Sequence, residues 1–467
     1  MKRLKGYENY LHGQLGLYGH FILLADKFVK DNGRIALVLP ATVLRVKSAM
    51  GIRKLLTENY QIEYIITAWE RAAFSEGAQF REILLIARKT KASDNNSKCC
   101  ISSLRKLPSS NEEAKELAEK IKSIGQKLET GNVYSDDFLV AFATTHEELK
   151  GNIGNLYILI STYDLKIPLF EKQIFGRGSR KIIKVEDYLR ANKCEIFEFD
   201  YRPPYHGVFL VRPFRAIKKL DEWTVKNENL EYLIIENRFT KEEMRVPSKV
   251  LVGGLRRPAR TDKIDLTNVL DYIITSEFDK VDKLLKNPFM LGKWKSYVEP
   301  RLANLLISRR FDISAAGTKF IAYYSSLPLV GVDMWSFRGV SGDDAKIIGL
   351  WFNSTLNLLS ILTQRTETRG AWMKIHEYML KDSLMLDPSK LSTEERSLLL
   401  EVFNKIKDVS FPCVLEQLRE RFWARVEIDR AILKVLGFNE QETNQILDYL
   451  YPALTKEIEQ LKTLMQG

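Results

Sequence analysis

The sequence predicts an α/β domain, followed by an irregular α+β domain and a C-terminal helical segment. In the first ninety-odd residues, helical periodicity alternates with short unbroken apolar runs. The middle of the chain has short strand-like runs separated by turns, and apolar positions recur at helical spacing near its end. The predicted domains are residues 1–95, a connecting region 96–184, a second domain 185–390 and a helical segment 391–467.

The first domain is expected to contain the order helix, strand, helix, strand, strand. Apolar residues recur at helical spacing from Leu15 to Val29, and Asn32-Gly33 is a natural helix stop. The run "RIALVLP" that follows is typical of a strand buried on both faces of a sheet. A polar helix is expected from about Lys47 to Tyr60, before the runs "IEYIIT" and "EILLIAR". Because no helix separates these two runs, the last strand is predicted to be antiparallel.

This fragment is incomplete as a sheet. Three strands would leave the edge of Ile35–Leu39 uncovered, and parallel sheets are rarely stable with so few strands. Cofactor loops in such sheets are glycine-rich turns that follow a strand and open a helix. The candidates "GNIGN" (151–155), "FGRGSR" (175–180) and "VGGLRRP" (252–258) lack that context and are interpreted as turns.

The composition narrows the classes of partner. Lys+Arg 71 against Asp+Glu 60 gives a net charge of +11, which favours a polyanion such as nucleic acid, although a mildly basic protein without such a partner fits equally well. No apolar run has the length of a membrane span, so no membrane contact is expected. The four cysteines and five histidines are scattered, which predicts neither disulfides nor a metal site and fits the cytoplasm.

The segments "LYGHFILLADKFVKDNGRIALVLPATVL", "RKLLTENYQIEYIIT" and "AAFSEGAQFREILLIARK" resemble the second half of the catalytic domain of adenine-specific, gamma-class DNA methyltransferases of restriction-modification systems. The resemblance implies a partial S-adenosylmethionine-methyltransferase sheet with an antiparallel end strand. In that family the cofactor motif and an Asn-Pro-Pro-Tyr/Phe loop lie upstream of these segments, and this chain has neither. S-adenosylmethionine is therefore expected to be bound by a partner polypeptide or a missing N-terminal half, and not by this chain alone.

The same resemblance points to residues around the target base. It implies that Phe74, or as a second choice Phe80, stacks on an extruded adenine, which would offset part of the cost of base flipping. The alternative is an ordinary packed aromatic residue. Pro40, Ala41 and Thr42 end a strand at the carboxyl edge of the sheet, where α/β proteins place their ligands, and are expected to line the site.

The stretch "DYRPPYH" (200–206) is similar to an amino-methyltransferase catalytic loop, but Arg202 stands where the family has Asn, Asp or Ser. Arginine has no acceptor for the target amine. The stretch also lies more than a hundred residues beyond the position that the resemblance assigns to the loop. It is therefore interpreted as a proline-stiffened turn, and no catalytic residue is assigned to this chain.

The second domain is expected to contact double-stranded DNA. The stretch "IIGLWFNSTLNLLSILTQRTETRGAWMKI" resembles methyltransferase target-recognition domains, in which "NS" begins a helix after a strand. Arginine suits phosphates and guanine edges because its planar fork makes two parallel hydrogen bonds. Any single arginine is more often an ordinary solvated residue, whereas the clusters as a set favour DNA contact. The candidate DNA-binding residues are Arg256, Arg257, Arg260, Arg309, Arg310, Arg365, Arg369 and Lys374.

Two functions remain open on the sequence. The first is DNA binding and target-base recognition as the C-terminal part of an adenine-specific DNA methyltransferase, inactive until a partner supplies the cofactor half. The second is a non-enzymatic DNA-binding or specificity protein derived from a truncated methyltransferase gene. Both lack the same residues, so the sequence does not separate them.

Overall fold

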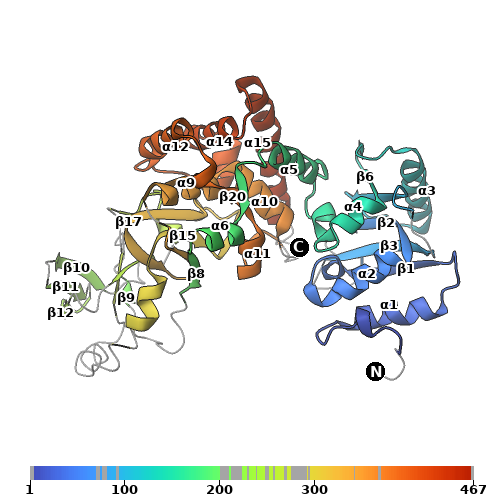
Figure 1. Ribbon diagram of the computed structural model, residues 1–467, viewed down its shortest axis with the longest axis horizontal. Coiled ribbons are helices and arrows are strands. Elements are labelled where there is room, and N and C mark those ends of the chain that lie inside the picture. Colours follow the sequence, from blue (N-terminus) through green and yellow to red (C-terminus); the bar gives the residue numbers. More distant parts are fainter. Residues whose placement is uncertain are drawn as a thin grey trace. The chain divides into compact units, whose positions relative to one another are not determined.

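The computed structural model describes residues 5–69, 74–75, 81–90, 94–199, 210–211, 223–228, 231–237, 239–247, 252–255, 258–267, 271–274, 292, 295–340, 342–365 and 370–463. The chain forms two compact units, coloured by sequence in Figure 1. Unit 1 comprises Met1–Gln173, Ile361–Ala371 and Lys456–Gly467, and unit 2 comprises Ile174–Ser360 and Trp372–Thr455.

Unit 1 begins with the predicted order of elements. These are α1 (Leu17–Phe28), β1 (Arg34–Pro40), α2 (Met50–Glu58), β2 (Tyr60–Ala68) and β3 (Glu82–Lys89). β3 lies between β1 and β2 and pairs antiparallel with both, which confirms the expected reversal of the last strand. Because the chain turns back after β2, β3 inserts beside the earlier strand instead of extending the sheet.

The sheet of unit 1 continues past the expected boundary near residue 95. Its order is β1-β3-β2-β4-β6-β5, with β4 at Lys98–Leu104, β5 at Val133–Ser135 and β6 at Leu139–Thr145. Helix α3 (Asn111–Lys127) starts at Ser110, whose side chain accepts from the Glu113 N–H. The predicted connecting region therefore belongs to the first unit as far as Gln173. The rest of this segment forms α4 (His146–Gly151), the 3₁₀ helix η5 (Leu156–Ile160) and α5 (Lys166–Arg177).

The two faces of this sheet carry separate apolar clusters, because side chains alternate along each strand. One face packs against α1, α2 and η5 and buries Ile35, Leu39, Ile65, Leu85 and Ile101. The other face packs against α3 and buries Ile66, Cys100, Leu104, Ile121 and Leu139.

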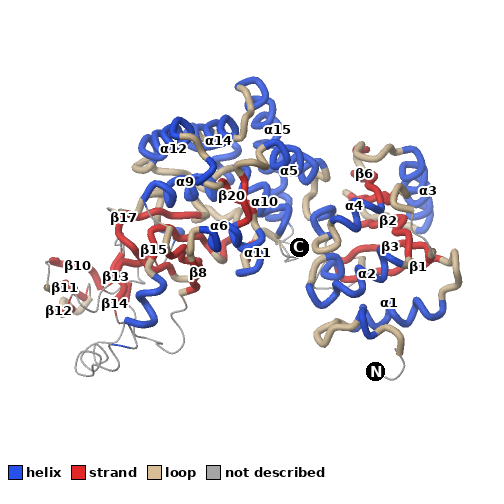
Figure 2. The backbone as a smooth tube through the Cα atoms, in the orientation of Figure 1, coloured by secondary structure: helices blue, strands red, loops and turns tan. Residues whose placement is uncertain are grey.

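Unit 2 is built on a seven-stranded sheet of order β8-β18-β15-β17-β13-β14-β9, beside a small sheet β10-β11-β12 and the two-stranded pairs β16-β19 and β20-β7. Figure 2 shows the strands in red and the helices in blue. The strands are β7 (Ile182–Lys184), β8 (Glu195–Glu198), β9 (Leu210–Val211), β10 (Trp223–Glu228), β11 (Tyr232–Asn237), β12 (Glu243–Pro247), β13 (Val252–Leu255), β14 (Asp271–Ile274), β15 (Ala303–Ser308), β16 (Arg310–Asp312), β17 (Ala322–Gly331), β18 (Met334–Arg338), β19 (Trp372–Lys374) and β20 (Leu384–Leu386). This mixture of sheets agrees with the expected irregular α+β domain.

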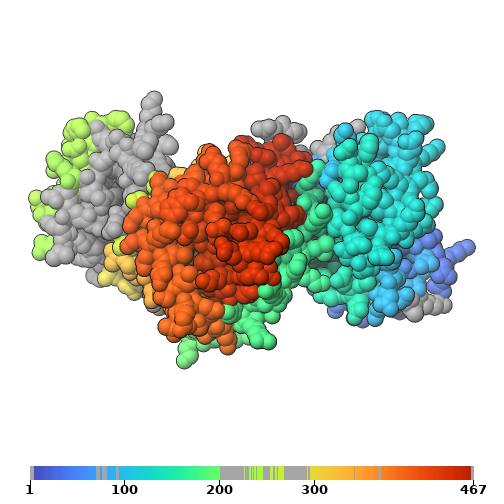
Figure 3. All heavy atoms as spheres, turned by 90° about the horizontal axis from the view of Figure 1, so that it is seen from above, coloured from blue at the N-terminus to red at the C-terminus, as the bar shows by residue number. Residues whose placement is uncertain are grey.

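The helices from the last third of the chain cover one face of unit 2, as the orange and red atoms of Figure 3 show. α9 packs on β15 and β17, and α12 and α14 pack in turn on α9. The predicted C-terminal helical segment therefore joins the second unit as far as Thr455, and its last residues belong to unit 1. The helices are α6 (Val185–Ala191), α9 (Gly342–Asn353), α10 (Thr355–Gln364), α11 (Glu377–Asp382), α12 (Thr393–Ile406), α13 (Val414–Arg419), α14 (Trp423–Val435) and α15 (Glu440–Thr463).

One sequence expectation about this region is wrong. The residues before Asn353-Ser354 form helix α9 and not a strand, so the "NS" pair joins two helices. The run is apolar on all sides because α9 is buried between the sheet and the outer helices. The Asn353 side chain accepts from the N–H groups of Ile321 and Ala322 and so fixes α9 to β17.

Among the described residues, no single helix is long and apolar enough to cross a membrane. Only together, with a bend of 60° between them, do α9 and α10 reach the length and apolar composition of a membrane span.

A buried polar network holds the helices of unit 2 together. Asp429 of α14 accepts hydrogen bonds from the Thr355 backbone N–H (2.7 Å), the Thr355 hydroxyl and the Tyr451 hydroxyl (2.6 Å). Arg425, one turn earlier, donates to Gln417 (2.8 Å) and to Thr355 (3.2 Å). Burial raises the pKa of Asp429 despite Arg425 and these donors, and burial lowers the pKa of Arg425. The network therefore places four elements around one carboxylate.

Candidate functional site

The carboxyl end of β1 has the position that the sequence assigned to it. Pro40 is the last residue of β1, and Ala41 and Thr42 begin the 3₁₀ helix η3 (Ala41–Leu44). The Ala41 N–H donates to the Arg81 carbonyl (2.8 Å), and the side chain of Ala41 is completely buried. Pro40 and Thr42 are half-buried and remain the two residues that a ligand at this edge could contact.

Phe74 is tethered to the same end of the sheet. The N–H of the next residue, Ser75, donates to the Glu82 carboxylate (2.8 Å), and Glu82 is the register partner of Pro40. The Phe74 ring is half-buried and packs with Tyr64 and Leu84 against the α3-side cluster. It lines a groove of about 920 Å³ between α3 and the sheet. The structure thus brings Phe74 and Pro40 to one end of the sheet, and base stacking by Phe74 stays a prediction.

The loop that carries Phe74 is held at both ends by a buried arginine, a feature that sequence reasoning missed. Trp69 precedes the loop and Arg81 follows it, and the Arg81 guanidinium lies 4.4 Å from the centre of the Trp69 ring. Arg81 also donates to the Thr67 hydroxyl (3.1 Å) and the Tyr157 hydroxyl (3.3 Å). Burial lowers the pKa of this guanidinium. Arg81 therefore closes the loop with a cation–π contact and two hydrogen bonds.

A carboxylate and a second arginine complete this cluster within unit 1. Glu457 is 1% exposed and accepts from the Tyr163 N–H (2.6 Å). Burial raises the pKa of Glu457 to about 7, against the opposing effects of Arg365, the Tyr163 amide and Arg81. Among the described residues, Glu457 Oε1, Arg81 Nη2 and Trp69 Nε1 are buried without a hydrogen-bond partner. Buried polar atoms of this kind normally bind a ligand or an ordered water, and this end of the sheet offers three of them.

Arg365, one of the expected DNA contacts, belongs to this buried cluster. Its side chain donates twice to the Ser161 carbonyl, at 3.1 and 3.0 Å, and its residue is 5% exposed. Its guanidinium lies 5.8 Å from the centre of the Trp69 ring. Contact with a phosphate would require Arg365 to leave both hydrogen bonds, so in this structure it acts as a support of the Phe74 loop.

The glycine-rich segments singled out in the sequence lie within helices, at a helix end and in a strand. Gly151 ends α4, Gly176 lies in the last turn of α5, and Gly253 and Gly254 lie within β13. None of these glycines follows a strand and opens a helix, which is the geometry that presents backbone N–H groups to such a cofactor. "VGGL" is strand rather than the turn expected from the sequence. In the described part of the chain, no group of three His, Cys, Asp or Glu side chains could hold a metal ion either.

In unit 2 the structure brings two of the predicted DNA-binding residues together. β16 and β19 pair antiparallel, with Arg310 directly opposite Lys374 and Asp312 opposite Trp372. Arg310 is exposed, Lys374 is half-buried and Trp372 is 52% exposed. Two cations facing each other on one ribbon repel, so the arrangement is stabilised when an anion lies over both. We call Arg310, Trp372 and Lys374 the basic ribbon.

The other predicted contacts differ from these two. Arg309 is ion-paired with Glu198 and, at 3.5 Å, with Asp333, and its side chain is 14% exposed, so its charge is already compensated. Arg260 ends the 3₁₀ helix Pro258–Arg260, where only the backbone is described. Arg256, Arg257 and Arg369 lie outside the described residues, as do Phe80 and the stretch 200–206 with Arg202.

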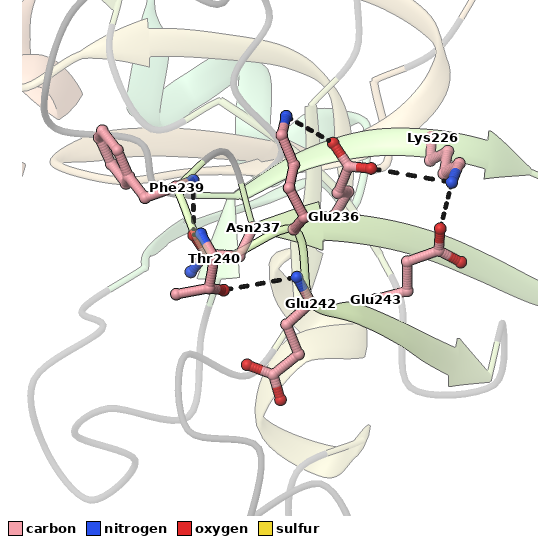
Figure 4. Close-up of polar contacts among 8 residues, drawn as sticks. Lys226, Glu236, Asn237, Phe239, Thr240, Glu242 and Glu243 are labelled. Atoms are coloured by element: carbon pink, nitrogen blue, oxygen red, sulfur yellow. Dashed lines mark hydrogen bonds and ion pairs between the residues drawn. The ribbon is translucent and has the colours of Figure 1, made fainter.

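The lysines described in the small sheet β10-β11-β12 are paired with acids. Figure 4 shows Lys226 between the carboxylates of Glu236 (3.7 Å) and Glu243. Lys241 forms an ion pair with Glu236 (3.2 Å). Each lysine is thus matched by an acid. Phe239, in the turn after β11, points away from these ion pairs and is 68% exposed.

Three comparisons with known proteins were informative to different degrees. No curated protein matches the sequence. The structure has weak similarity to the type IIG restriction endonuclease BpuSI (12% identity, TM-score 0.44, covering 99% of this chain and 51% of that one). Its similarity to the structure of the type IIL restriction-modification enzyme MmeI in complex with DNA is equally weak (11% identity, TM-score 0.41, covering 99% of this chain and 54% of that one). This chain thus spans about half the length of either enzyme. Its residues 1–74, from the amino terminus through β1, α2 and β2 to Phe74, match the Eco57I restriction-modification methylase family.

Proposed function

We propose that this chain binds DNA and recognises the target base as the C-terminal part of an adenine-specific DNA methyltransferase. The reaction would move a methyl group from S-adenosylmethionine to the exocyclic amine of adenine. A complementary half would supply the cofactor site and the Asn-Pro-Pro loop. The match of residues 1–74 to a restriction-modification methylase family carries the proposal. The antiparallel insertion of β3 between β1 and β2 supports it.

A non-enzymatic DNA-binding or specificity protein is the second candidate. The observation that favours it is the position of the glycines Gly151, Gly176, Gly253 and Gly254, none of which follows a strand and opens a helix. The two functions differ in one measurable respect, because only the first allows methyl transfer to be restored by a complementary half.

The deciding experiment measures methyl transfer from labelled S-adenosylmethionine to DNA. The chain is assayed alone and with the polypeptide encoded immediately upstream of it. We expect no transfer by the chain alone and transfer by the mixture. Calorimetry with S-adenosylmethionine completes the test, because binding by the isolated chain would contradict the assignment of the cofactor to the complementary half. Mixtures that bind DNA but never methylate it would favour the specificity protein.

The basic ribbon provides a prediction for DNA binding. The double variant Arg310→Ala/Lys374→Ala is expected to weaken binding of duplex DNA and to lower the slope of log K against log salt by about 2, since each lost phosphate contact removes about one unit. Electrophoretic mobility shift across a salt series measures both quantities. The matched control is Lys226→Ala/Lys241→Ala, which removes the same charge from ion-paired lysines. An equal loss in both variants would show that only net charge matters.

Phe74 provides a prediction for base recognition. In the active mixture, Phe74→Ala is expected to slow methyl transfer about 5- to 150-fold, because stacking on a base contributes about 1–3 kcal/mol. Phe74→Tyr should keep most of the rate, whereas Phe74→Leu fills the groove but does not stack. Equal rates for the Leu and Tyr variants would assign Phe74 to core packing. Phe138→Ala, which removes a 52%-exposed aromatic ring from the same unit, is the control.

A further inference from the structure

Helix α1 of unit 1 buries Ile22 and Leu23 and presents a second apolar stripe outward. Leu17, Phe21, Leu24 and Phe28 follow one stripe of the helix and are 77%, 66%, 41% and 78% exposed. The inward side includes the charged Asp26, which accepts hydrogen bonds from Tyr60 (2.7 Å) and Tyr7 and pairs with Lys89 (2.9 Å). Burial raises the pKa of Asp26, but these partners together hold it below its ordinary value. The buried carboxylate fixes the rotation of α1, so the apolar stripe cannot turn inward.

The strand beside α1 has a free edge. β1 is the terminal strand of the sheet and, among the described residues, pairs with β3 alone. At the two ends of β1, the Lys89 N–H donates to the Gly33 carbonyl and the Ala41 N–H donates to the Arg81 carbonyl. Gly33, Ala41 and every second residue between them therefore direct their backbone N–H and C=O groups toward β3. In an antiparallel pair the backbone groups of alternate residues point to opposite sides. The N–H and C=O groups of Ala36 and Val38 therefore point away from β3, toward the free edge.

The face of the sheet opposite α1 is also uncovered next to β1. Ala36 is exposed and Val38 is 49% exposed, and their register partners on β3, Ile86 and Leu84, are only half-buried. Ile86 and Leu84 line one side of the groove under α3, so the open face and the groove are continuous. The unbroken apolar run of β1 suits a strand covered on both faces, and the described residues cover only one.

We propose that the α1 stripe, the free edge of β1 and the open face form one docking surface for the complementary half of the methyltransferase. This deepens, and rests on, the function proposed above. The three features meet at β1, since α1 contacts β1 and the open face begins on it. The occupant is a separate α/β polypeptide. It adds a strand beside β1 and places apolar elements over α1 on one side and over Val38 on the other.

A second copy of this chain fits this surface less well. Two copies that pair antiparallel through β1 about a two-fold axis bring like faces to the same side. Their α1 stripes would meet, but on the other side the two open faces would adjoin with no described helix to cover either. An α/β partner covers both faces, because helices alternate with strands in such a chain.

The test uses the full chain and the polypeptide encoded immediately upstream. We expect a one-to-one complex in sedimentation velocity, with its dissociation constant measured by calorimetry. Phe21→Asp/Phe28→Asp is expected to weaken it about 100-fold or more, because buried aromatic anchors dominate interfaces. Ala36→Pro removes one outward N–H from an edge strand, where proline is tolerated, and Val38→Asp places a charge on the open face. Each should weaken the complex and leave the circular dichroism unchanged.

The control is Phe239→Asp, which changes an equally exposed phenylalanine of unit 2 and should leave the complex intact. Absence of a complex, or a complex that none of the three variants weakens, overturns the proposal. Self-association of the chain that the Phe21/Phe28 variant abolishes overturns it in favour of a second copy. A complex that forms as described but methylates no DNA leaves the docking surface standing and rejects the methyltransferase function, so the two failures are distinguishable.

Discussion

Replacing Asp429 with alanine is expected to lower the free energy of unfolding of unit 2 by about 3–5 kcal/mol, the cost of removing one partner from a buried charged network. The substitution leaves the Thr355 N–H, the Thr355 hydroxyl and the Tyr451 hydroxyl without their acceptor. It also leaves Arg425 fully buried with no carboxylate nearby. Urea unfolding, with hydrogen exchange of α14 as the local probe, measures the loss.

Two milder variants bracket this result. Asp429→Asn keeps an acceptor of the same shape and should cost less than alanine, and Tyr451→Phe removes a single hydrogen bond, for about 1–2 kcal/mol. If alanine costs no more than Tyr451→Phe, the network does not hold the helices together in the way described.

Stability of unit 1 is expected to fall by about 3 kcal/mol as the pH rises from about 4.5 to above 7, through Glu457 alone. Burial raises the pKa of this carboxyl from 4.5 to about 7 in the folded chain. Between these values the folded state keeps a proton that the unfolded state has released. Raising the pH therefore favours unfolding, and the stabilising proton is fully present only below the unfolded value.

Glu457→Gln isolates this effect, because glutamine is neutral throughout and can still accept from the Tyr163 N–H. The wild-type chain should lose stability relative to the variant between pH 5 and 8, most steeply between its unfolded pKa of 4.5 and its folded pKa of about 7. The readout is the protection of β2 and β3 from hydrogen exchange, compared between the wild-type chain and the variant at pH 5 and at pH 8. Parallel curves for the two proteins would mean that Glu457 titrates at its ordinary value and is not confined as the structure indicates.

The first five elements of unit 1 could be predicted from the sequence because their signals are local. Helical spacing indicated α1, the apolar run "RIALVLP" indicated β1, and the missing helix before β3 indicated its reversal. The extension of the sheet by β4, β5 and β6 was not predicted. A charged helix interrupts these strands, and their pairing joins residues far apart along the chain, such as Lys98 and Thr145.

The candidate site was predictable to a smaller degree. Resemblance directed attention to Phe74 and Pro40, which the structure places at one end of the sheet through Glu82. The Arg81 cluster could not be found in this way, since Tyr157 and Glu457 are distant in sequence and none of these residues has a motif. Arg365 shows the converse, because a basic side chain in a basic stretch gives no sign that it is buried against Ser161.

Unit 1 is assembled from three separate stretches of chain, and this has a consequence for synthesis on the ribosome. Glu457 reaches its partner Tyr163 only after 294 further residues have been translated. At about 5–20 residues per second this is a delay on the order of 15–60 seconds. During that time the part of unit 1 already made lacks the Glu457 carboxylate as the acceptor for the Tyr163 N–H. A chain that stops short of residue 457 never acquires that carboxylate, so premature termination near the very end should be as harmful to unit 1 as a lesion in its own core.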